Sequence, residues 1–385
     1  MFSITIWFLS AFIIFWAMIG YPISLKILSK IIKRRPTHLD GYEPTVTVMV
    51  VAHDEEKVIK EKLDNIVSVD YPIEKLDILV TSDHSTDCTN QIVKDYIECH
   101  KNRKIQLYVT KEHRGKTNAQ NEAQKLVESE ILVLTDANSI FEKDAIRQLV
   151  SCFYDESVAY VTGRLCYIND SCNMTANSEG FYWRLDLMER KMESDIQTIT
   201  AGNGAIYACR NRLYKVIDPI KCHDLIWPLQ YALDKKRALY NPRAIAYEKA
   251  GESDEDEFKR KVRMNRTILK DILPDLKILN IFKYKWFTYF YLGHRTFRYL
   301  LWIAHIFLLA SNIIIAFKYK WAKIMLGLQS LFYIIALAGK IRKNPNKLER
   351  ISWYYLMTMI AQLCGAKNML LGKTKPTWDK AETTR

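Results

Sequence analysis

The chain has 385 residues, a formal net charge of +13 at pH 7 and eight cysteines, and 49% of its residues are hydrophobic. The cysteines form no CxxC pair, which disfavours a zinc site or a disulfide framework. No nucleic-acid-binding motif accompanies the basic charge. We therefore assign the basic residues to a membrane surface and to phosphate binding, and expect no nucleic-acid partner.

The N-terminal segment is apolar enough to cross a bilayer. Residues 1–24 carry no charged side chain, and a basic stretch follows between residues 26 and 35. A secretory signal would have a basic start and a shorter apolar core. We predict a transmembrane helix over residues 1–28, and the positive-inside bias places its C-terminal end in the cytoplasm.

Residues 43–270 alternate short apolar runs with amphipathic stretches, a pattern typical of βαβ units around a parallel sheet. Strands are predicted at 45–52, 76–81 and 105–110, and a fourth runs from residue 131 to Asp136. Three of the four end in polar clusters at one sheet edge, where α/β proteins bind ligands. There is no G-x-G-x-x-G after the first strand and no Walker A sequence, which disfavours dinucleotide-binding domains and P-loop NTPases.

After residue 270 the sequence becomes apolar and aromatic. Residues 271–296 are predicted to form interfacial helices, because 281–293 combine aromatic and basic side chains. Residues 297–372 are predicted membrane segments, with spans at 297–317 and 321–339 and a shorter, re-entrant or interfacial segment at 351–366. Residues 373–385 then form a cytoplasmic tail. The prediction is a multi-pass protein of the cell (inner) membrane with a cytoplasmic catalytic domain.

The end of the fourth strand carries a candidate metal site. Asp136 and Asn138 stand two residues apart, so both side-chain oxygens can reach one cation. Mg²⁺ or Mn²⁺ held there would make a diphosphate a better leaving group. An Asx-turn that caps a helix predicted at 141–150 explains either residue equally well.

Two further polar residues suit a nucleotide-diphosphate sugar. Asp83 can accept hydrogen bonds from a uracil imide or a ribose hydroxyl, and Lys116 can neutralise a diphosphate. Gly115 lets the backbone pass close to the phosphates. Taken singly, Asp83 is equally a turn residue and Lys116 a solvated lysine at a helix start. Their joint placement favours the donor site.

Downstream residues suit an acceptor and a base. Gly202, Asn203 and Gly204 form a small-residue turn that either leaves room for an acceptor sugar or bends the chain between helix and strand. Asp224 can deprotonate an acceptor hydroxyl for in-line attack at the anomeric carbon, and one displacement inverts the configuration. His223 either tunes that carboxylate or is a hydrogen-bonded structural histidine.

The basic stretch 259–266 places Arg263 and Arg266 one helical turn apart. Arg263, together with Arg260, is a candidate ligand for the departing diphosphate. A juxtamembrane helix that binds anionic lipid has the same pattern.

From the first strand to the C-terminus, the chain resembles the membrane-integrated family 2 glycosyltransferases, the group that contains the cellulose, chitin and hyaluronan synthases. VVAHDEEKVI resembles the first-strand motif of that family, and SDHSTDCT resembles its nucleotide-binding aspartate motif. HRGKTNAQNEA is similar to its Gly-Lys-x-x-Ala-x-Asn element, and TDAN stands at its DxD. The resemblance implies a Rossmann-like α/β GT-A domain with α-helical transmembrane segments. It also implies an inverting, metal-dependent hexosyltransferase that uses a UDP-sugar.

The resemblance assigns a role to each matched position. The implied nucleotide and donor ligands are Ala52, Glu55, Asp83, Lys116, Asp136, Arg260 and Arg263; Asp136 and Asn138 hold Mg²⁺ or Mn²⁺, and Asp224 is the base. The turn of Gly202, Asn203 and Gly204 is expected to lie at the acceptor. In the tail, Trp378 and Arg385 resemble the C-terminal gating segment of the family.

The departures from the family pattern leave the product open. Asn138 replaces the second aspartate of DxD, and at the QxxRW motif Arg263 remains while the Gln and Trp are lost. In processive members that Trp is expected to stack on the acceptor sugar. We expect a synthase of an extracellular or capsular polysaccharide, with translocation of the product across the membrane as an open question. The alternatives are a single-addition transferase onto a lipid-linked acceptor and a non-catalytic subunit of a polysaccharide export complex.

Overall fold

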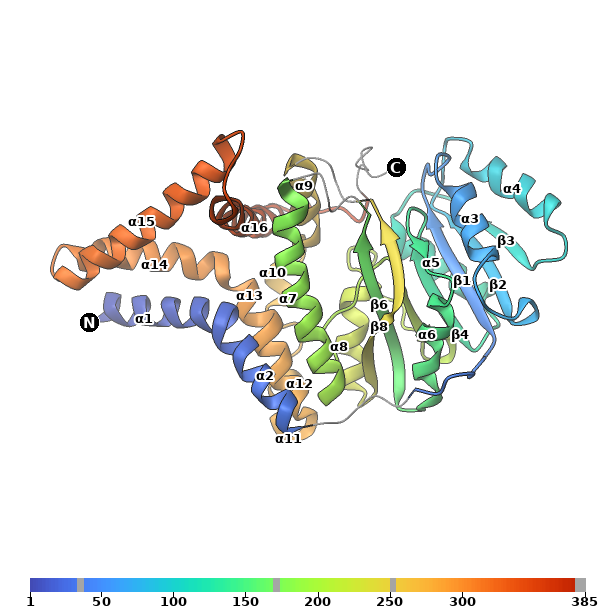
Figure 1. The fold of residues 1–385 in the computed structure, drawn as a ribbon, viewed down its shortest axis with the longest axis horizontal. Helices are drawn as coiled ribbons and strands as arrows, with labels where there is room; N and C mark the ends of the chain where they lie inside the picture. Colours follow the sequence, from blue (N-terminus) through green and yellow to red (C-terminus); the bar gives the residue numbers. More distant parts are fainter. Residues whose placement is uncertain (33–37, 169–173, 250–253, 378–385) are drawn as a thin grey trace. The chain divides into compact units, whose positions relative to one another are not determined.

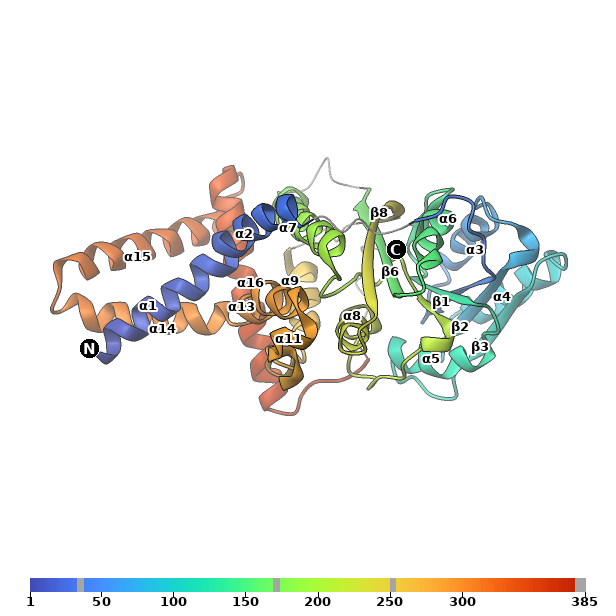
Figure 2. The ribbon, with the colours of Figure 1, turned by 90° about the horizontal axis from the view of Figure 1, so that it is seen from below.

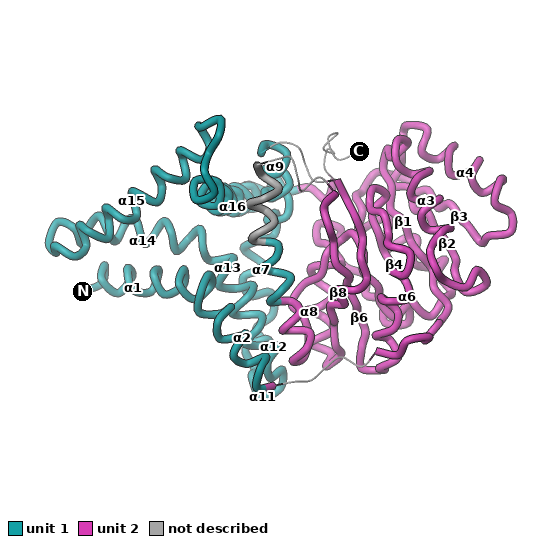
Figure 3. Tube along the Cα trace, in the orientation of Figure 1, with its two compact units in different colours: residues 1–31, 169–189, 251–374 teal, residues 32–168, 190–250, 375–385 magenta. Residues whose placement is uncertain are grey.

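The computed structural model describes residues 1–32, 38–168, 174–249 and 254–377, and it divides into two compact units (Figure 3). Unit 1 comprises residues 1–31, 169–189 and 251–374, and unit 2 comprises residues 32–168, 190–250 and 375–385. The predicted gating-like residues Trp378 and Arg385 lie outside the described residues. The domain boundaries expected from the sequence, including 43–270, stay predictions.

Unit 2 is built around a mixed sheet (Figure 1). In the described part of the chain it has eight strands in the order β3-β2-β1-β4-β7-β6-β8-β5. The first four strands in this order are parallel, β7 is antiparallel to both β4 and β6, β8 is parallel to β6, and β5 is antiparallel to β8. The strands are β1 (Val46–Ala52), β2 (Leu76–Ser82), β3 (Ile105–Val109), β4 (Ile131–Asp136), β5 (Ile140–Phe141), β6 (Val158–Tyr167), β7 (Tyr207–Arg210) and β8 (Arg237–Glu248).

Helices of unit 2 connect these strands. The α-helices are α3 (Ile59–Val67), α4 (Thr89–Cys99), α5 (Lys116–Ala123), α6 (Ala145–Val150) and α8 (His223–Leu233), and α7 (Met174–Ile196) begins in unit 1 and ends in unit 2. Short 3₁₀ turns are η2 (Ile73–Lys75), η3 (Gln124–Leu126), η4 (Ser151–Tyr154) and η5 (Asn211–Leu213). The four strands predicted from the sequence are present, and β1, β2 and β4 end at the same edge of the sheet.

The central parallel strands form the core because both of their faces are covered. Every residue of β1 is buried, and so is every residue of β4 before Asp136. On the other side of β4, the fully buried indole of Trp227 on α8 packs edge-on against the rings of Tyr160 and Tyr207, with centroids 6.4 and 6.1 Å away. These aromatic contacts fix α8, and hence Asp224, against β6 and β7.

One local prediction in unit 2 needs correction. A helix was predicted at 141–150, but residues 140–141 form β5, and α6 begins only at Ala145. Ile140 and Phe141 pair with Tyr247 and Ala246 of β8. This partner lies far along the chain, so the local periodicity carries no sign of it.

Unit 1 is helical, and its helices α1, α14 and α15 run beside one another in both views (Figures 1 and 2). The first three elements are α1 (Phe2–Phe15), the π-helix η1 (Trp16–Gly20) and α2 (Tyr21–Ile31). The later ones are α9 (Asp254–Met264), α10 (Ile268–Asp271), η6 (Leu276–Leu279), α11 (Ile281–Tyr284), α12 (Trp286–Phe290), the π-helix η7 (Tyr291–Thr296), α13 (Phe297–Tyr299), α14 (Leu301–Ala316), α15 (Lys320–Ile341) and α16 (Lys347–Leu370).

Within the described residues, two helices are long and apolar enough to cross a membrane, as judged by length and composition. They are Phe2–Ile31 and Lys320–Ile341, with mean hydropathies of 2.2 and 1.7. The pair Trp286–Tyr299 and Leu301–Ala316 meets the same criterion together but is bent by 57°. Large apolar side chains on these helices are exposed, among them Phe8, Ile324 and Leu331. The multi-pass topology stays a prediction.

Two details of unit 1 differ from the sequence-based expectation. Residues 281–293 do not form one helix, because Lys285 has a φ of 55° and separates α11 from α12. The segment predicted at 351–366 lies within the longer helix α16, which begins with a capping box formed by Asn346 and Glu349. Its place relative to a membrane, re-entrant or interfacial, stays a prediction.

Candidate active site

The candidate site lies at the sheet edge where β1, β2 and β4 end. Ala52 pairs with Ser82 in the register of β1 and β2, and Val51 pairs with Asp136 in that of β1 and β4. The backbone N–H of Asp83 donates to the carbonyl of Ala52 (2.8 Å). Three of the predicted donor residues, Ala52, Asp83 and Asp136, therefore stand at adjoining strand ends.

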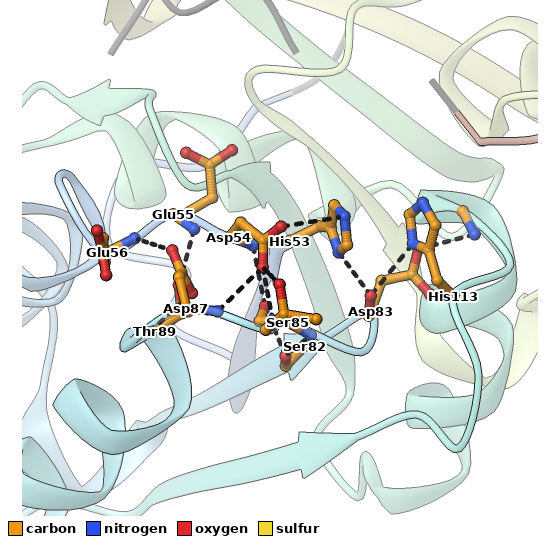
Figure 4. A network of polar contacts seen from close by, with 12 residues as sticks. His53, Asp54, Glu55, Glu56, Ser82, Asp83, Ser85, Asp87, Thr89 and His113 are labelled. Atoms are coloured by element: carbon orange, nitrogen blue, oxygen red, sulfur yellow. Dashed lines mark hydrogen bonds and ion pairs between the residues drawn. The ribbon is translucent and has the colours of Figure 1, made fainter. Parts of the chain in front are cut away.

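The loop after β1 is bonded to the loop after β2 through Asp54 (Figure 4). Asp54 Oδ1 accepts from the backbone N–H groups of Thr86 (2.6 Å) and Asp87 (3.3 Å), and its own N–H donates to Ser85 Oγ (3.0 Å). Asp54 has a φ of 51°, a conformation that Asn and Asp adopt more readily than other side chains. Asp54 therefore replaces the expected Asn at little conformational cost.

The neighbouring Glu55 is almost fully buried, with 6% of its surface exposed. Its backbone N–H donates to Thr89 Oγ1 (2.7 Å) at the start of α4, and the N–H of Glu56 donates to Asp87 Oδ2 (3.1 Å). These bonds fix the backbone that carries the predicted nucleobase ligands. The contact of Ala52 and Glu55 with a nucleobase stays a prediction.

Asp83 organises the loop that carries Lys116. Its side chain is 2% exposed, and its carboxylate accepts from the backbone N–H groups of Arg114 (3.1 Å) and Gly115 (2.7 Å) and pairs with Nδ1 of His113 (2.8 Å). Gly115, with a φ of 92°, then begins α5. Asp83 thus shapes the phosphate loop, and its direct contact with a nucleotide stays a prediction.

Two histidines at this edge were not singled out from the sequence. The rings of His53 and His113 stack with centroids 3.9 Å apart and planes 13° from parallel, and both lie beside Asp83 in Figure 4. His53 Nδ1 is 2.8 Å from the carbonyl oxygen of Asp83. The two residues are 60 positions apart in the numbering, 53 and 113, and no local pattern joins them.

Lys116, Asp136 and Gly204 come together at the centre of the site. The Nζ of Lys116 donates to Oδ1 of Asp136 (2.5 Å). A Cβ placed on Gly204 would lie 3.1 Å from that Nζ and 3.3 Å from Asp136 Oδ2. Burial lowers the pKa of Lys116, but the carboxylates of Asp136 and Asp224 outweigh it and raise that pKa above its ordinary value. The ammonium therefore stays charged, as diphosphate binding requires.

Asp224 is the second residue of α8 and is half-buried. Burial raises the pKa of its carboxyl group, the ammonium of Lys116 opposes that rise, and Asp136 adds to it. A carboxylate with a raised pKa is a stronger base than an exposed one. The backbone carbonyl of Asp224 accepts from the N–H of Gly202 (2.7 Å), so the predicted base and the predicted acceptor turn are hydrogen-bonded to each other.

The turn of Gly202, Asn203 and Gly204 is held from inside. Asn203 is 5% exposed, and its amide donates to the carbonyl of Gly163 (2.7 Å) and accepts from the N–H groups of Ala205 and Ile206 (both 3.2 Å). A Cβ on Gly202 would lie 1.9 Å from the hydroxyl of Tyr160. The Asn203 side chain thus shapes the turn, and acceptor binding by these three residues stays a prediction.

His223 is a structural residue. It is 1% exposed, its Nδ1 lies 2.9 Å from Gln120 Oε1, and its Nε2 lies 3.1 Å from both Asn121 Oδ1 and the hydroxyl of Tyr214. Burial, with the nearby charge of Lys116, lowers the pKa of the imidazole to about 3. Of the two interpretations drawn from the sequence, the hydrogen-bonded structural histidine agrees with the structure.

The oxygen donors at the end of β4 fit a hard divalent cation. Asp136 and Asn138 are both half-buried, and the missing side chain of Gly204 leaves space beside Asp136 Oδ2. Among the described residues, no group of three or more His, Cys, Asp and Glu side chains is placed to hold a metal ion. Mg²⁺ commonly takes one or two protein carboxylates and completes its shell with substrate phosphates and water, which suits this donor set.

Arg260 and Arg263 belong to unit 1, on α9. The guanidinium of Arg260 donates to both carboxylate oxygens of Glu257 (2.6 and 3.0 Å). The helix ends at Met264, and Arg266 continues in a turn whose N–H donates to the carbonyl of Arg263 (3.1 Å). The part of Arg260 and Arg263 in diphosphate binding stays a prediction.

The comparisons with known proteins agree with this site. Residues 47–217 match the family model described as glycosyl transferase family 2. The chain contains a glycosyltransferase family 2 domain. The matched residues run from β1 past β7 and include every predicted donor residue of unit 2.

A solved structure shows the fold of this glycosyltransferase chain. The mannosyltransferase PcManGT from Pyrobaculum calidifontis, solved in complex with GDP-Man and Mn²⁺, superposes with a TM-score of 0.74 at 22% identity, over 96% of this chain and 99% of that one. The predicted fold class, an α/β GT-A domain with additional helices, is confirmed.

Curated relatives share the family 2 domain. A probable glycosyltransferase, YdaM, of Bacillus subtilis is 34% identical over 33% of this chain and 30% of the relative. The β-monoglucosyldiacylglycerol synthase of Nostoc sp. is 26% identical over 44% of this chain and 38% of the relative. The poly-β-1,6-N-acetyl-D-glucosamine synthase of Staphylococcus epidermidis is 26% identical over 32% and 28%. The chain therefore matches less than two fifths of the length of each.

Proposed function

We propose that this chain is an inverting, metal-dependent membrane glycosyltransferase that moves a sugar from a UDP-sugar onto a growing polysaccharide. The observation that carries the proposal is the convergence of Lys116, Asp136 and the 202–204 turn, with Asp224 bonded to that turn. A cation for the diphosphate, oxygens for a metal and a carboxylate base thus occupy one sheet edge.

Donor binding is assigned to the ends of β1, β2 and β4. Ala52, Glu55 and Asp83 would hold the nucleotide, and Lys116, with Arg260 and Arg263, would neutralise the diphosphate. Asp136 and Asn138 would hold Mg²⁺ or Mn²⁺, which withdraws charge from the diphosphate and makes it a better leaving group. The complex of PcManGT with GDP-Man and Mn²⁺ supports a metal and a nucleotide-sugar donor here.

Transfer is assigned to Asp224. Its carboxylate takes the proton of an acceptor hydroxyl, whose oxygen attacks the anomeric carbon from the face opposite the diphosphate. A carbon–oxygen bond forms to the acceptor as the bond to the phosphate oxygen breaks, and UDP leaves with the electron pair. A single displacement inverts the anomeric configuration. Lys116 compensates the negative charge that grows on the diphosphate.

The acceptor distinguishes two versions of the proposal. The relatives include a polysaccharide synthase and a lipid glycoside synthase, so a lipid-linked acceptor that receives one sugar is the alternative. Met264 stands where processive relatives are expected to carry the Trp, and it is 61% exposed. The cell (inner) membrane location, a cytoplasmic active site and subunits of an export complex as partners belong to the same proposal.

The first experiment offers purified chain a panel of labelled UDP-sugars, with GDP-mannose for comparison, in the presence of Mg²⁺ or Mn²⁺. The expected result is transfer from one UDP-sugar and inhibition by UDP, which keeps the diphosphate contacts. A ladder of long products supports the polysaccharide synthase, and a single product supports the lipid-linked acceptor.

The second experiment replaces the base. Asp224→Asn keeps the shape of the side chain but removes the proton acceptor, so transfer should fall by about 10²–10⁴-fold while UDP binding remains. Asp234→Asn, at the exposed C-terminal end of the same helix, is the matched control and should retain full activity. Unchanged glycan production in cells that carry Asp224→Asn would instead favour the non-catalytic export subunit.

A further inference from the structure

Lys62 is a buried lysine behind the metal turn, the residues Asp136–Asn138. It lies on α3, and none of its side chain is exposed. Its Nζ donates to Thr135 Oγ1 (3.0 Å) and to the carbonyl oxygen of Ser139 (2.5 Å). These two residues immediately precede and follow the metal turn, so one ammonium group joins both ends of it.

A second residue of α3 extends this attachment. Asn65 lies one helical turn after Lys62, and its amide exchanges two hydrogen bonds with the backbone of Phe141, at 2.9 and 2.7 Å. The ring of Phe141 covers the ammonium of Lys62, with the centroid 3.7 Å from Nζ. The whole segment from residue 135 to residue 141 is therefore fastened to α3.

Thr135 connects Lys62 to the acceptor side. A threonine hydroxyl has one proton to donate, and Thr135 Oγ1 lies 2.7 Å from the carbonyl oxygen of Ala205 as acceptor. The same oxygen then accepts from Lys62. Ala205 directly follows Gly204, the residue that leaves space beside Asp136 and Lys116. A two-bond path thus runs from Lys62 to the 202–204 turn.

An ammonium group is an expensive way to fill space in a core. Burial lowers the pKa of Lys62 to about 7, and the carboxylates of Asp136 and Glu248 oppose that change. An apolar side chain of the same length would avoid the desolvation cost. What it would lack is a set of directed donors that reach both Thr135 and Ser139, and this is the property that the site uses.

We propose that Lys62 is a positioning residue that holds the metal turn and, through Thr135, the 202–204 turn in the geometry that binds metal and donor. The inference rests on the proposed function of the metal turn. Lys62 acts through Thr135 and Ser139 and touches neither metal nor substrate. Its loss should weaken divalent-cation binding and reduce turnover, even in protein that remains folded.

The test is a Mn²⁺ titration in the presence of UDP, followed by electron paramagnetic resonance, on wild type, Lys62→Met and Lys60→Met. Lys62→Met should weaken Mn²⁺ binding by about 10- to 100-fold, the effect typical of groups that orient metal ligands. Lys60, on the same helix, is exposed and pairs with Asp64, so Lys60→Met should match wild type.

The sign of the change separates the explanations. Removal of a nearby positive charge without loss of geometry would tighten Mn²⁺ binding, because the charge repels the cation. A lysine that only fills space would leave the Mn²⁺ affinity unchanged and lower the melting temperature alone. Tighter or unchanged binding by folded Lys62→Met therefore overturns the inference.

A second variant decides the matter if Lys62→Met does not fold. Thr135→Val keeps the volume of the side chain, removes the hydroxyl that joins Lys62 to Ala205, and leaves the bond from Lys62 to Ser139. It should weaken Mn²⁺ binding and raise the KM for the acceptor. Wild-type values for both quantities would contradict the role of Lys62.

The same titration keeps this inference apart from the proposed function. Wild type that neither binds Mn²⁺ with UDP nor transfers sugar would reject the proposed function itself. Wild type that does both, with Lys62→Met and Thr135→Val indistinguishable from it, would reject the positioning role alone.

Discussion

At the scale of single residues, Lys116 has opposite consequences for two neighbours on α8. Its positive charge lowers the pKa of both His223 and Asp224, against a background of burial that favours the neutral form of each. For His223 the charge adds to burial and keeps the imidazole neutral. For Asp224 it opposes burial and helps to keep the carboxylate ionised. The base therefore has a neutral neighbour where relatives are expected to carry a second acid.

The neutral His223 predicts a pH dependence of stability. Its folded pKa of about 3 lies below the ordinary 6.5, so between these values the unfolded chain binds more protons than the folded one. Stability due to this group is fully present above pH 6.5 and falls by about 1.4 kcal/mol per pH unit below it. His223→Gln has no such group, so the free energies of unfolding of the two proteins should converge between pH 6.5 and 4.5.

The measurement is urea denaturation of wild type and His223→Gln at several pH values, followed by circular dichroism. His100→Gln is the control, because His100 is a partly exposed residue at the end of α4. A difference between wild type and His223→Gln that stays constant from pH 6.5 to 4.5 would contradict the buried neutral histidine.

At the scale of elements, the site is made by loops at strand ends, and strands were easier to predict than loops. The apolar runs at 46–52 and 131–135 are buried on both faces, so their sequence alone indicates central strands. The common edge of β1, β2 and β4 follows from parallel pairing. Asp83, Lys116, Asp136 and Asp224 were therefore found from motifs that follow these elements.

Other parts of the site depend on contacts between distant segments. Lys62 lies in an amphipathic helix pattern where a lysine is usually solvated, and its partners are 73 and 77 positions away. The inward orientation of Asn203 depends on the carbonyl of Gly163 in β6. Neither contact leaves a periodic signal in the sequence. The short strand β5 was missed for the same reason.

The start of α5 gives a prediction about the phosphate loop. Gly115 has a φ of 92°, and a Cβ there would lie 2.7 Å from the carbonyl oxygen of Pro376 in the same unit. Gly41 has a similar φ of 86° with nothing within 4 Å of such a Cβ. Gly41→Ala should cost the backbone strain alone, about 1–3 kcal/mol, whereas Gly115→Ala should cost more.

Gly115→Ala should also raise the KM for the donor, because the N–H of Gly115 donates to Asp83 and the next residue is Lys116. Thermal unfolding and donor kinetics of both alanine variants check this. Equal losses of stability in the two variants would show that the Pro376 segment moves away freely. An unchanged donor KM in Gly115→Ala would show that the loop does not set the position of Lys116.

At the scale of the whole molecule, composition separates the two units. The family 2 domain match at 47–217 lies mostly in unit 2, while the two helices apolar enough to cross a membrane both lie in unit 1. Outward-facing apolar side chains on those helices need a nonpolar environment, since exposed patches of this kind are rare on soluble monomers. The net charge of +13 suits an anionic cytoplasmic leaflet.

Native cysteines test the proposed placement of unit 2 in the cytoplasm. The seven cysteines within the described residues form no disulfide with one another, and Cys88 and Cys99, on the two ends of α4, are exposed. A membrane-impermeant maleimide added to intact cells should leave both unlabelled, and permeabilised cells should show labelling at both. Cys88→Ser with Cys99→Ser identifies their share of the signal. Labelling of these two thiols in intact cells would place the active site outside, where UDP-sugars are absent, and the proposed donor would then be untenable.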